Sequence, residues 1–548
     1  MHKFVMSVLS ITLLFSCTNS ESTSTIAAII NSDSLLAHIS TLSSDEYEGR
    51  RPFTAGETKT ISYLQSQCQA IGLEPGNGNS LVQDVPLVEI KPKGTPQLSV
   101  QTKQGKVDFK NMEDFVIFTE STDSAITVDA ADLVFCGFGV VAPEYNWNDF
   151  EGLDLKNKVV LVMVNDPGFT TGDSTLFKGK TMTYYGRWTY KFEEAARQGA
   201  KGCLIVHNTA AASYPFSVVQ NSNGGTKLHL DSRGSNNYQL PIEGWVSEPT
   251  AKKLLAAAGL DSSVFIKANQ RGFKPIDLGM KVSAKLQTSV VFNTSKNVIA
   301  KITGSTKPDE CIVYTAHWDH LGIGKPDANG DSIYNGALDN ASGTAAVLEV
   351  ARSFKNQKEK PERSIVFLFV TAEEQGLLGS AWYATHPVFP PAKTVANINI
   401  DVINANGPMK DISISGAGQS ELEDIFSDEI KKQGRYIAPE SRPEAGLYFR
   451  SDHFNFAKAG VPALTTDNGV DHAEKGKEFG QQKEEEWNTK YYHQPDDEYV
   501  TSRWDIAGAL QDIQVLFNVG RRLAYGTEWP KWKEGSEFKA IREKSGVQ

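Results

Sequence analysis

CIVYTAHWDH, at residues 311–320, is the stretch that most clearly indicates the fold. In it, a run of mainly apolar residues is followed directly by two histidines and an aspartate. The apolar part predicts a buried strand, with His317 where that strand meets a loop. Two similar runs follow, SIVFLFVTA at 364–372 and VANINID at 395–401, and a helical pattern at 341–354 comes before them. Continuous apolar strands alternating with amphipathic helices predict an α/β fold with a mixed, largely parallel sheet sandwiched by helices. Active residues should then gather at the carboxyl ends of the strands.

Acidic and imidazole side chains follow these apolar runs or stand beside a helix start. The candidates are His317, Asp339 in GALDNASG, the adjacent pair Glu373 and Glu374, Asp401, and His493 in YYHQPDD. Each one alone has an ordinary structural explanation. Together, two imidazoles and three carboxylates match the nitrogen and oxygen ligands that zinc prefers, and one carboxylate remains as a base. Because successive residues of an extended chain point to opposite sides, one member of the glutamate pair can bind metal while the other faces the substrate.

The ordered motifs AHWDH, GALDNASG, TAEEQGLLGS, NINID and YYHQPDD resemble those of the co-catalytic di-zinc aminopeptidases. These zinc exopeptidases, with a phosphorylase/hydrolase-like fold, are relatives of glutamate carboxypeptidase and the transferrin receptor. The resemblance covers about residues 298–525 and implies that the chain binds two Zn²⁺ ions and hydrolyses peptide substrates. Carried over by residue, it implies that Asp339 bridges both ions, with His317 and Asp401 on one and Glu374 and His493 on the other.

The resemblance also implies roles for residues that do not bind metal. Glu373 becomes the general base, which accepts a proton from the attacking water and passes it to the leaving amine. Asp319 is expected to orient a metal-binding histidine from outside the ligand shell. Tyr492 is expected to donate a hydrogen bond to the developing oxyanion. The remaining histidines considered, which the family pattern does not need, are His320, His386, His453 and His472.

The chain is too long, at 548 residues, for one ordinary core, so we expect two domains. Short β-rich runs at 125–285 resemble an inserted protease-associated domain, notably GLDLKNKVVLVMV and FEEAARQGAKGCLIVHN. The predicted organisation is a signal peptide with a lipobox-like end at 1–17, a tether at 18–30, the first part of the peptidase domain at 31–124, the insert at 125–285, the main peptidase part at 286–526 and a loosely docked extension at 527–548.

The N-terminus and the overall charge predict where the protein works. An apolar run after Lys3 leads to Leu14-Phe15-Ser16-Cys17, which resembles the end of a bacterial lipoprotein signal. We expect an exported lipoprotein, facing the periplasm or the cell exterior, with the lipid on Cys17 as its only membrane contact. The net charge of −11 argues against binding to nucleic acid, which is itself negatively charged. The other four cysteines form no CxxC pair and are expected to be buried thiols.

Several functions stay open at this stage. Aminopeptidase action is favoured, because Glu373 and Asp401 could receive a free amine. Carboxypeptidase action would need an arginine cluster for a terminal carboxylate, and only Arg442 and Arg450 are near in sequence. A glutaminyl-cyclase-like transferase and a non-catalytic, receptor-like binding protein are further alternatives; retention of every ligand argues against both. The sequence does not indicate side-chain preference or oligomeric state.

Overall fold

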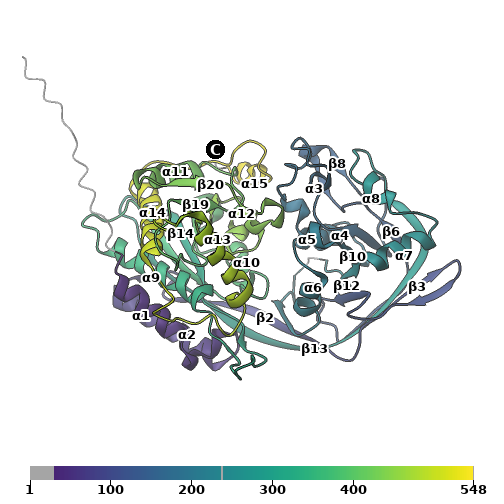
Figure 1. The fold of residues 1–548 in the computed structure, drawn as a ribbon, viewed down its shortest axis with the longest axis horizontal. Helices are drawn as coiled ribbons and strands as arrows, with labels where there is room; N and C mark the ends of the chain where they lie inside the picture. The colour runs from purple at the N-terminus through teal and green to yellow at the C-terminus, as the bar shows by residue number, and fades with distance from the viewer. Residues whose placement is uncertain (1–29, 236–237, 547–548) are drawn as a thin grey trace, which may run out of the picture.

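The computed structural model describes residues 30–235 and 238–546. The predicted signal peptide, and all of the predicted tether except residue 30, lie outside this range. Two units lie side by side and share the long strand β13 (Ile276–Ile302), which runs beneath both of them (Figure 1). Residues 276–287 of this strand pair with one sheet, and residues 288–302 pair with the other. The units are therefore joined through continuous backbone hydrogen bonding.

The first unit, called the peptidase unit below, is built on a mixed sheet. Its strand order is β21 (Ala463–Leu464), β18 (Thr394–Asn399), β14 (Lys307–His317), β17 (Arg363–Val370) and β13, extended by β2 (Val82–Pro92). The first four strands are parallel, whereas β13 is antiparallel to both β17 and β2. This confirms the predicted α/β fold with a mixed, largely parallel sheet.

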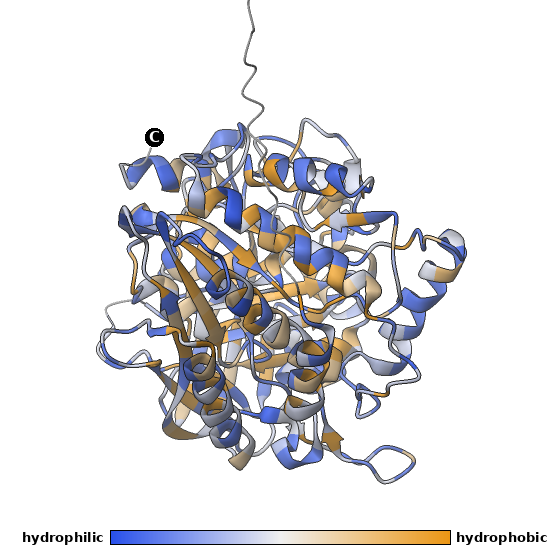
Figure 2. Ribbon diagram, turned by 90° about the vertical axis from the view of Figure 1, so that its left-hand side faces the viewer, coloured by the Kyte–Doolittle hydropathy of each residue, from blue (hydrophilic) through white to orange (hydrophobic). Residues whose placement is uncertain are grey.

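Alternate residues of the central strands face two separate cores. Ile312 and Tyr314 pack with the helices α1 (Ser32–Leu42), α2 (Ala55–Ile71), α9 (Ser342–Lys355), α11 (Leu422–Lys432) and α14 (Ala507–Tyr525). Cys311 and Val313 face the other side, with α10 (Leu378–Thr385) and α12 (His453–Lys458). Figure 2 shows the hydrophobic strands inside and mixed, partly hydrophilic helices around them. A sheet covered on both faces explains why its strands read as unbroken apolar runs.

The second unit has its own sheet, and this sheet begins earlier in the chain than the predicted boundary at 125. Its strands are β3 (Gln97–Thr102), β4 (Gly105–Asp108), β5 (Phe115–Phe118), β6 (Ala125–Phe135), β9 (Lys158–Met163), β10 (Gly202–His207) and β12 (Ile242–Ser247). β3 belongs here because it pairs with the first half of β13. The resemblance of this unit to a protease-associated domain stays a prediction.

Short helices and one exchanged strand complete the second unit. The helices are α3 (Gly168–Thr171), α4 (Trp188–Arg197), α5 (Thr209–Ala212), α6 (Phe216–Asn223), α7 (Glu248–Ala257) and α8 (Ser263–Lys267). β11 (Lys227–Leu230) leaves this unit and pairs with β2 of the peptidase sheet. The chain therefore connects the two units at three places: between β2 and β3, at β11, and within β13.

The C-terminal segment after Tyr525 packs more closely than the expected loosely docked extension. Trp532 and Phe538 are 5% and 1% exposed and join the core behind the sheet, and the indole nitrogen of Trp532 donates to the Gly460 carbonyl at 2.8 Å. Because many charged residues surround these two aromatic residues in the sequence, their packing was not predicted. No helix among the described residues is long and apolar enough to span a membrane. The four cysteines in this part of the chain are buried and unpaired, as predicted.

Candidate metal centre

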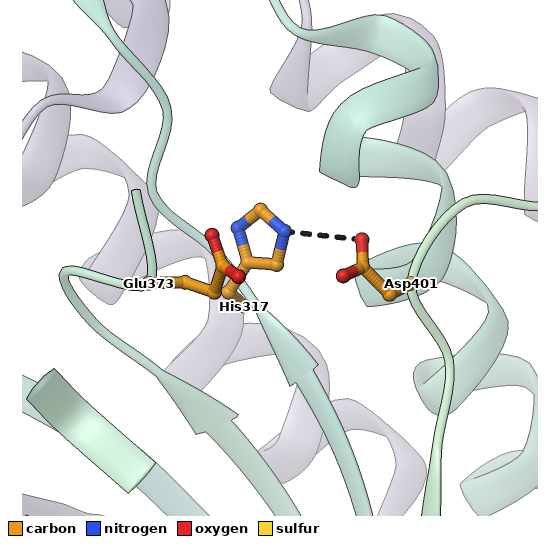
Figure 3. A group of neighbouring side chains, drawn as sticks. All are labelled: His317, Glu373 and Asp401. Carbon is orange, nitrogen blue, oxygen red and sulfur yellow. Dashed lines mark hydrogen bonds and ion pairs between the residues drawn. The ribbon is translucent and has the colours of Figure 1, made fainter. Parts of the chain in front are cut away.

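The candidate centre lies where three neighbouring parallel strands end. His317 is the last residue of β14, Glu373 and Glu374 follow β17, and Asp401 follows β18. The register pairs His317 with Val370, so these strand ends lie at the same edge of the sheet. Figure 3 shows His317, Glu373 and Asp401 converging from these three places. The candidate residues therefore lie at the carboxyl edge of the sheet, where the predicted fold places an active site.

Asp339 stands between two imidazoles. Its Oδ1 lies 3.3 Å from His317 Nε2, and its Oδ2 lies 3.3 Å from His493 Nε2. His317 Nε2 is also 3.3 Å from Asp401 Oδ1, and His493 Nε2 is 3.1 Å from Glu374 Oε2. The five predicted ligands thus form two groups, each with one imidazole and one carboxylate, that share Asp339.

His320 also belongs to this cluster, although the sequence pattern left it out. Its Nδ1 lies 2.6 Å from Glu374 Oε1 without hydrogen-bond geometry, and its ring lies edge-on to that of His493, with ring centroids 5.7 Å apart. His320, Asp339 and Glu374 offer ligand atoms within 4.8 Å of one another, as do His317, Glu373 and Asp401. One signal in the sequence could have predicted the place of His320 in this cluster: two histidines stand three residues apart at the end of the same strand.

The protonation of the cluster is set by crowded charges. Burial opposes a charged His317, yet the surrounding carboxylates, with Glu373 foremost, hold its pKa well above the ordinary value. Burial also disfavours a charged Glu374, but His493 and His320 lower its pKa to about 2. Asp339 behaves alike: its pKa lies well below the ordinary value, because His317 and His493 outweigh burial. The imidazoles of His317 and His493, whose pKa values are both raised by the surrounding carboxylates, are therefore the cations of the cluster.

Glu373 and Asp319 differ from the ligands in their protonation. Burial, together with the nearby Asp401 and Glu374, raises the pKa of Glu373 well above its ordinary value, against the opposing effect of His317. Burial raises the pKa of Asp319 to about 8. More carboxylates than imidazoles are thus packed here, and Asp319 Oδ2, Glu374 Oε1 and both ring nitrogens of His320 are buried without a hydrogen-bond partner. Divalent cations would supply both the missing charge and the missing partners, so this donor set fits zinc.

Contacts from outside the cluster hold its members in place. Asp319 Oδ1 accepts a hydrogen bond from the Glu373 backbone at 3.0 Å, while His317 Nδ1 lies 3.1 Å from the Asp319 carbonyl and 3.9 Å from its carboxylate. Asp319 therefore positions His317 through its carbonyl and Glu373 through its carboxylate. Asp497, which the sequence analysis did not single out, accepts hydrogen bonds from the Leu338 and Asp339 backbone.

Tyr492 lies at the mouth of the centre. Its ring stacks on His493 with centroids 3.9 Å apart, and its side chain remains exposed. A cavity of about 810 Å³ opens here, lined by residues that include His317, Glu373, Asp401, Arg450 and Tyr492. Four of the five predicted ligands, all except Glu374, therefore share with the predicted base and the tyrosine one cavity that is large enough for a short peptide.

Fold and site together define an α/β protein with a carboxylate and imidazole centre at the carboxyl edge of a mixed sheet. Residues 297–517 match the model of peptidase family M28, and the chain therefore contains an M28 peptidase domain. This confirms the family that the sequence motifs resemble.

Curated relatives match part of the chain. Aminopeptidase NAALADL1 of Mus musculus is 33% identical over 139 residues, which cover 24% of this chain and 17% of the relative. A probable zinc metalloprotease of Leptosphaeria maculans is 33% identical over 203 residues, or 37% of this chain and 43% of the relative. The chain thus matches less than half the length of each.

Solved structures with a similar fold include two bacterial enzymes. The aminopeptidase from Aneurinibacillus sp. strain AM-1 has a TM-score of 0.49 and 19% identity, covering 91% of this chain and 95% of that one. BSAP, a zinc aminopeptidase from Bacillus subtilis, has a TM-score of 0.43 and 18% identity, covering 95% of this chain and 100% of that one.

Proposed function

We propose that this chain is a zinc-dependent exopeptidase, and specifically an aminopeptidase, that hydrolyses the terminal bond of peptides. The observation that carries the proposal is the position of Asp339, whose two oxygens face different imidazoles. His317 and Asp401 would hold one zinc ion, Glu374 and His493 the other, and Asp339 both. When bound, zinc lowers the pKa of water towards neutrality and polarises a carbonyl group.

Glu373 has the properties that a general base needs in this site. It lies in the cavity beside His317 and Asp401. Because burial raises its pKa well above the ordinary value, its carboxylate readily accepts a proton and can return that proton to the leaving amine. Asp319 fixes the backbone of Glu373 and so keeps its carboxylate directed into the cavity.

The preference for a free amino terminus rests on the charges of the cavity. Glu373 and Asp401 both line it, and carboxylates attract an ammonium group. Tyr492, at the cavity mouth, is placed to donate a hydrogen bond to the oxygen of the reacting carbonyl. Residues in these roles would act only on a chain end that fits between them.

A panel of matched peptides tests the proposal. Purified protein with zinc should release leucine from Leu-Leu-amide, leave acetyl-Leu-Leu-amide intact and lose its activity in a chelator. Equal cleavage of the acetylated and free peptides would contradict an aminopeptidase, and exclusive cleavage of acetylated peptides with a free carboxyl end would favour a carboxypeptidase. Binding without hydrolysis of any peptide would favour the receptor-like alternative.

A further inference from the structure

Arg50 comes from a part of the chain far from the matched peptidase region, yet its side chain reaches the loops of the centre. It ends the short helix η1 (Asp45–Arg50), which follows α1, and it is only 1% exposed. Its Nε donates to the Trp318 carbonyl at 2.9 Å, next to a proposed zinc ligand, and its Nη2 donates to the Gly336 carbonyl at 2.8 Å. One guanidinium therefore links the end of β14 to the loop that leads to Asp339.

The hydrogen bonds of this guanidinium all go to backbone carbonyls. The other two run from Nη1 to the carbonyl of Leu42, where α1 ends, at 2.7 Å and to that of Asn335 at 2.6 Å. Because arginine carries five N–H donors in a rigid planar fork, one side chain can bind three separate segments at once. Lysine has three donors on a single nitrogen and cannot reproduce this arrangement.

The backbone of η1 is bent in a way that brings Arg50 to these carbonyls. Glu48, Gly49 and Arg50 have φ angles of 50°, 64° and 50°, so three successive residues lie in the left-handed region. For residues other than glycine this conformation costs free energy, and it persists where the surrounding structure enforces it. The surroundings are close: a Cβ atom on Gly49 would lie 2.5 Å from the Tyr334 carbonyl oxygen. The segment is therefore held in one position against the loops of the centre.

The loop that carries Asp339 is held from two sides. Arg50 binds the carbonyls of residues 335 and 336. Asp497 binds the next three amides, at 2.9 to 3.1 Å, through its own carbonyl and both oxygens of its carboxylate. No strand delivers Asp339, so these backbone hydrogen bonds set the position of the carboxylate that faces both imidazoles.

Arg50 also brings a lasting positive charge to the centre. Burial lowers its pKa to about 10, so the guanidinium remains charged at neutral pH. The carboxylates that oppose this effect of burial are those of Asp497, Asp319, Asp339 and Glu374. Arg50 does not line the cavity, and it is not placed to contact a substrate. Its influence on the reaction would therefore pass through the residues that it holds.

We propose that Arg50 is a positioning residue of the metal centre, which together with Asp497 fixes the loop at 335–339 so that Asp339 can bridge two zinc ions. This rests on the proposed two-zinc function. It makes the segment around η1 part of the centre, although that segment lies outside the matched region at 297–517. Groups that hold metal ligands in place commonly contribute roughly 10–100-fold to metal affinity or activity.

The zinc affinity of the full-length protein tests the proposal. Arg50→Met removes the four hydrogen bonds and should raise the zinc dissociation constant, measured by competition with a chelator, by about 10–100-fold. It should also change the visible absorption of the cobalt-substituted protein, which reports how ligand atoms are arranged around the metal. With saturating zinc, kcat on Leu-Leu-amide should fall while KM changes little, because Arg50 does not contact the substrate.

Further variants assign the effect to the loop. Arg50→Lys keeps the charge but cannot bind all four carbonyls, so its zinc affinity should lie between those of Arg50→Met and the unaltered protein. Asp497→Asn weakens the other side of the loop. Because both changes act on the same loop, the double variant should lose less affinity than the two single losses combined. Arg51→Met, at a neighbour that pairs with Glu89 at 3.5 Å, is the matched control and should keep zinc affinity and cobalt spectrum.

Two results would overturn the proposal. Unchanged zinc affinity and cobalt spectrum in Arg50→Met, with or without a lower melting temperature, would assign Arg50 a purely structural role; if that variant does not fold, the same result in Arg50→Lys decides. Fully additive losses in the double variant would show that Arg50 and Asp497 do not act on one loop. Zinc binding without hydrolysis in the unaltered protein would reject the peptidase function alone, whereas failure to bind zinc would reject both.

Discussion

The two units bury charged groups in opposite ways. In the second unit, Asp166 accepts hydrogen bonds from the Thr183 backbone and hydroxyl, at 2.9 and 2.8 Å. Asp149 accepts from two backbone amides and from the Trp147 indole. Lys191, 1% exposed, donates to two carbonyls and supplies the positive charge near both carboxylates. Every side-chain oxygen of the two aspartates and the lysine amine has a hydrogen-bond partner within the protein, so this group is balanced in its hydrogen bonding.

The centre of the peptidase unit is unbalanced in its hydrogen bonding. Carboxylates outnumber imidazoles there, and buried atoms of Asp319, Glu374 and His320 have no hydrogen-bond partner. His317, Asp319 and His320 of the centre are as deeply buried as the three charged residues of the second unit, so burial alone does not separate structural from functional charges. The presence or absence of internal partners does: a balanced group holds the fold, and an unbalanced one requires a ligand.

The largest expected effect comes from removing the base of the unbalanced group. Glu373→Gln keeps the shape of the side chain but cannot accept a proton, so kcat on Leu-Leu-amide should fall by about 10²–10⁴-fold. Zinc content and melting temperature should stay as they are, because Glu373 is not among the proposed ligands. Steady-state kinetics and metal analysis of the same preparation provide the measurement.

Glu485→Gln is the control for this substitution, since Glu485 is exposed and does not line the cavity. It should retain full activity. A Glu373→Gln protein that hydrolyses peptide at the original rate would show that another group takes the proton.

The next effect concerns the balanced group. Lys191→Met should lower the free energy of unfolding by about 3–5 kcal/mol, because it leaves Asp149 and Asp166 buried without a cation. Denaturant unfolding measures this change. Lys252→Met removes an exposed lysine that pairs with Glu248, and should change stability by less than about 1 kcal/mol. Equal effects of the two substitutions would mean that Lys191 does not stabilise the second unit.

A smaller effect follows from His453, which is fully buried and has no hydrogen-bond partner at either ring nitrogen. Burial lowers its pKa from 6.5 to about 3. Below pH 6.5 the unfolded chain binds a proton that the folded protein does not, so this histidine lowers stability as pH falls from 6.5 towards 3. Between pH 7 and pH 5 the loss amounts to about 2 kcal/mol.

His453→Phe should therefore make the free energy of unfolding less dependent on pH between 7 and 5. The comparison of pH profiles isolates this one residue from the many carboxylates that also titrate. His386→Phe, at an exposed histidine, should leave the profile unchanged. An unaltered slope in the His453 variant would show that the buried imidazole binds its proton in the folded state as readily as in the unfolded chain.

The sequence predicted which side chains gather at the centre, because three of the five candidate ligands follow strands. An apolar run that ends in His317 or Asp401 predicts a buried strand. It also predicts that this last side chain lies at the carboxyl edge of the sheet. The family motifs then assigned Asp339 and His493, which no strand delivers. His320 was missed because the family pattern needs only two histidines, although the chain brings a third to Glu374.

The contact between the cavity residue Arg450 and the second unit could not be predicted in the same way. Arg450 and its hydrogen-bond partner Ser213 are 237 positions apart and come from different units, so no local spacing links them. The early start of the second sheet was hidden for a similar reason. β3 carries no unusual pattern, and its membership depends on pairing with a strand nearly 180 residues later.

Zinc located by anomalous diffraction tests the central claim most directly. Crystals of the purified protein grown with zinc, measured on both sides of the zinc absorption edge, should show two peaks per chain. One peak should touch His317 and Asp401, the other Glu374 and His493, and both should touch Asp339. A single peak, or peaks away from Asp339, would contradict a shared two-zinc centre in this chain.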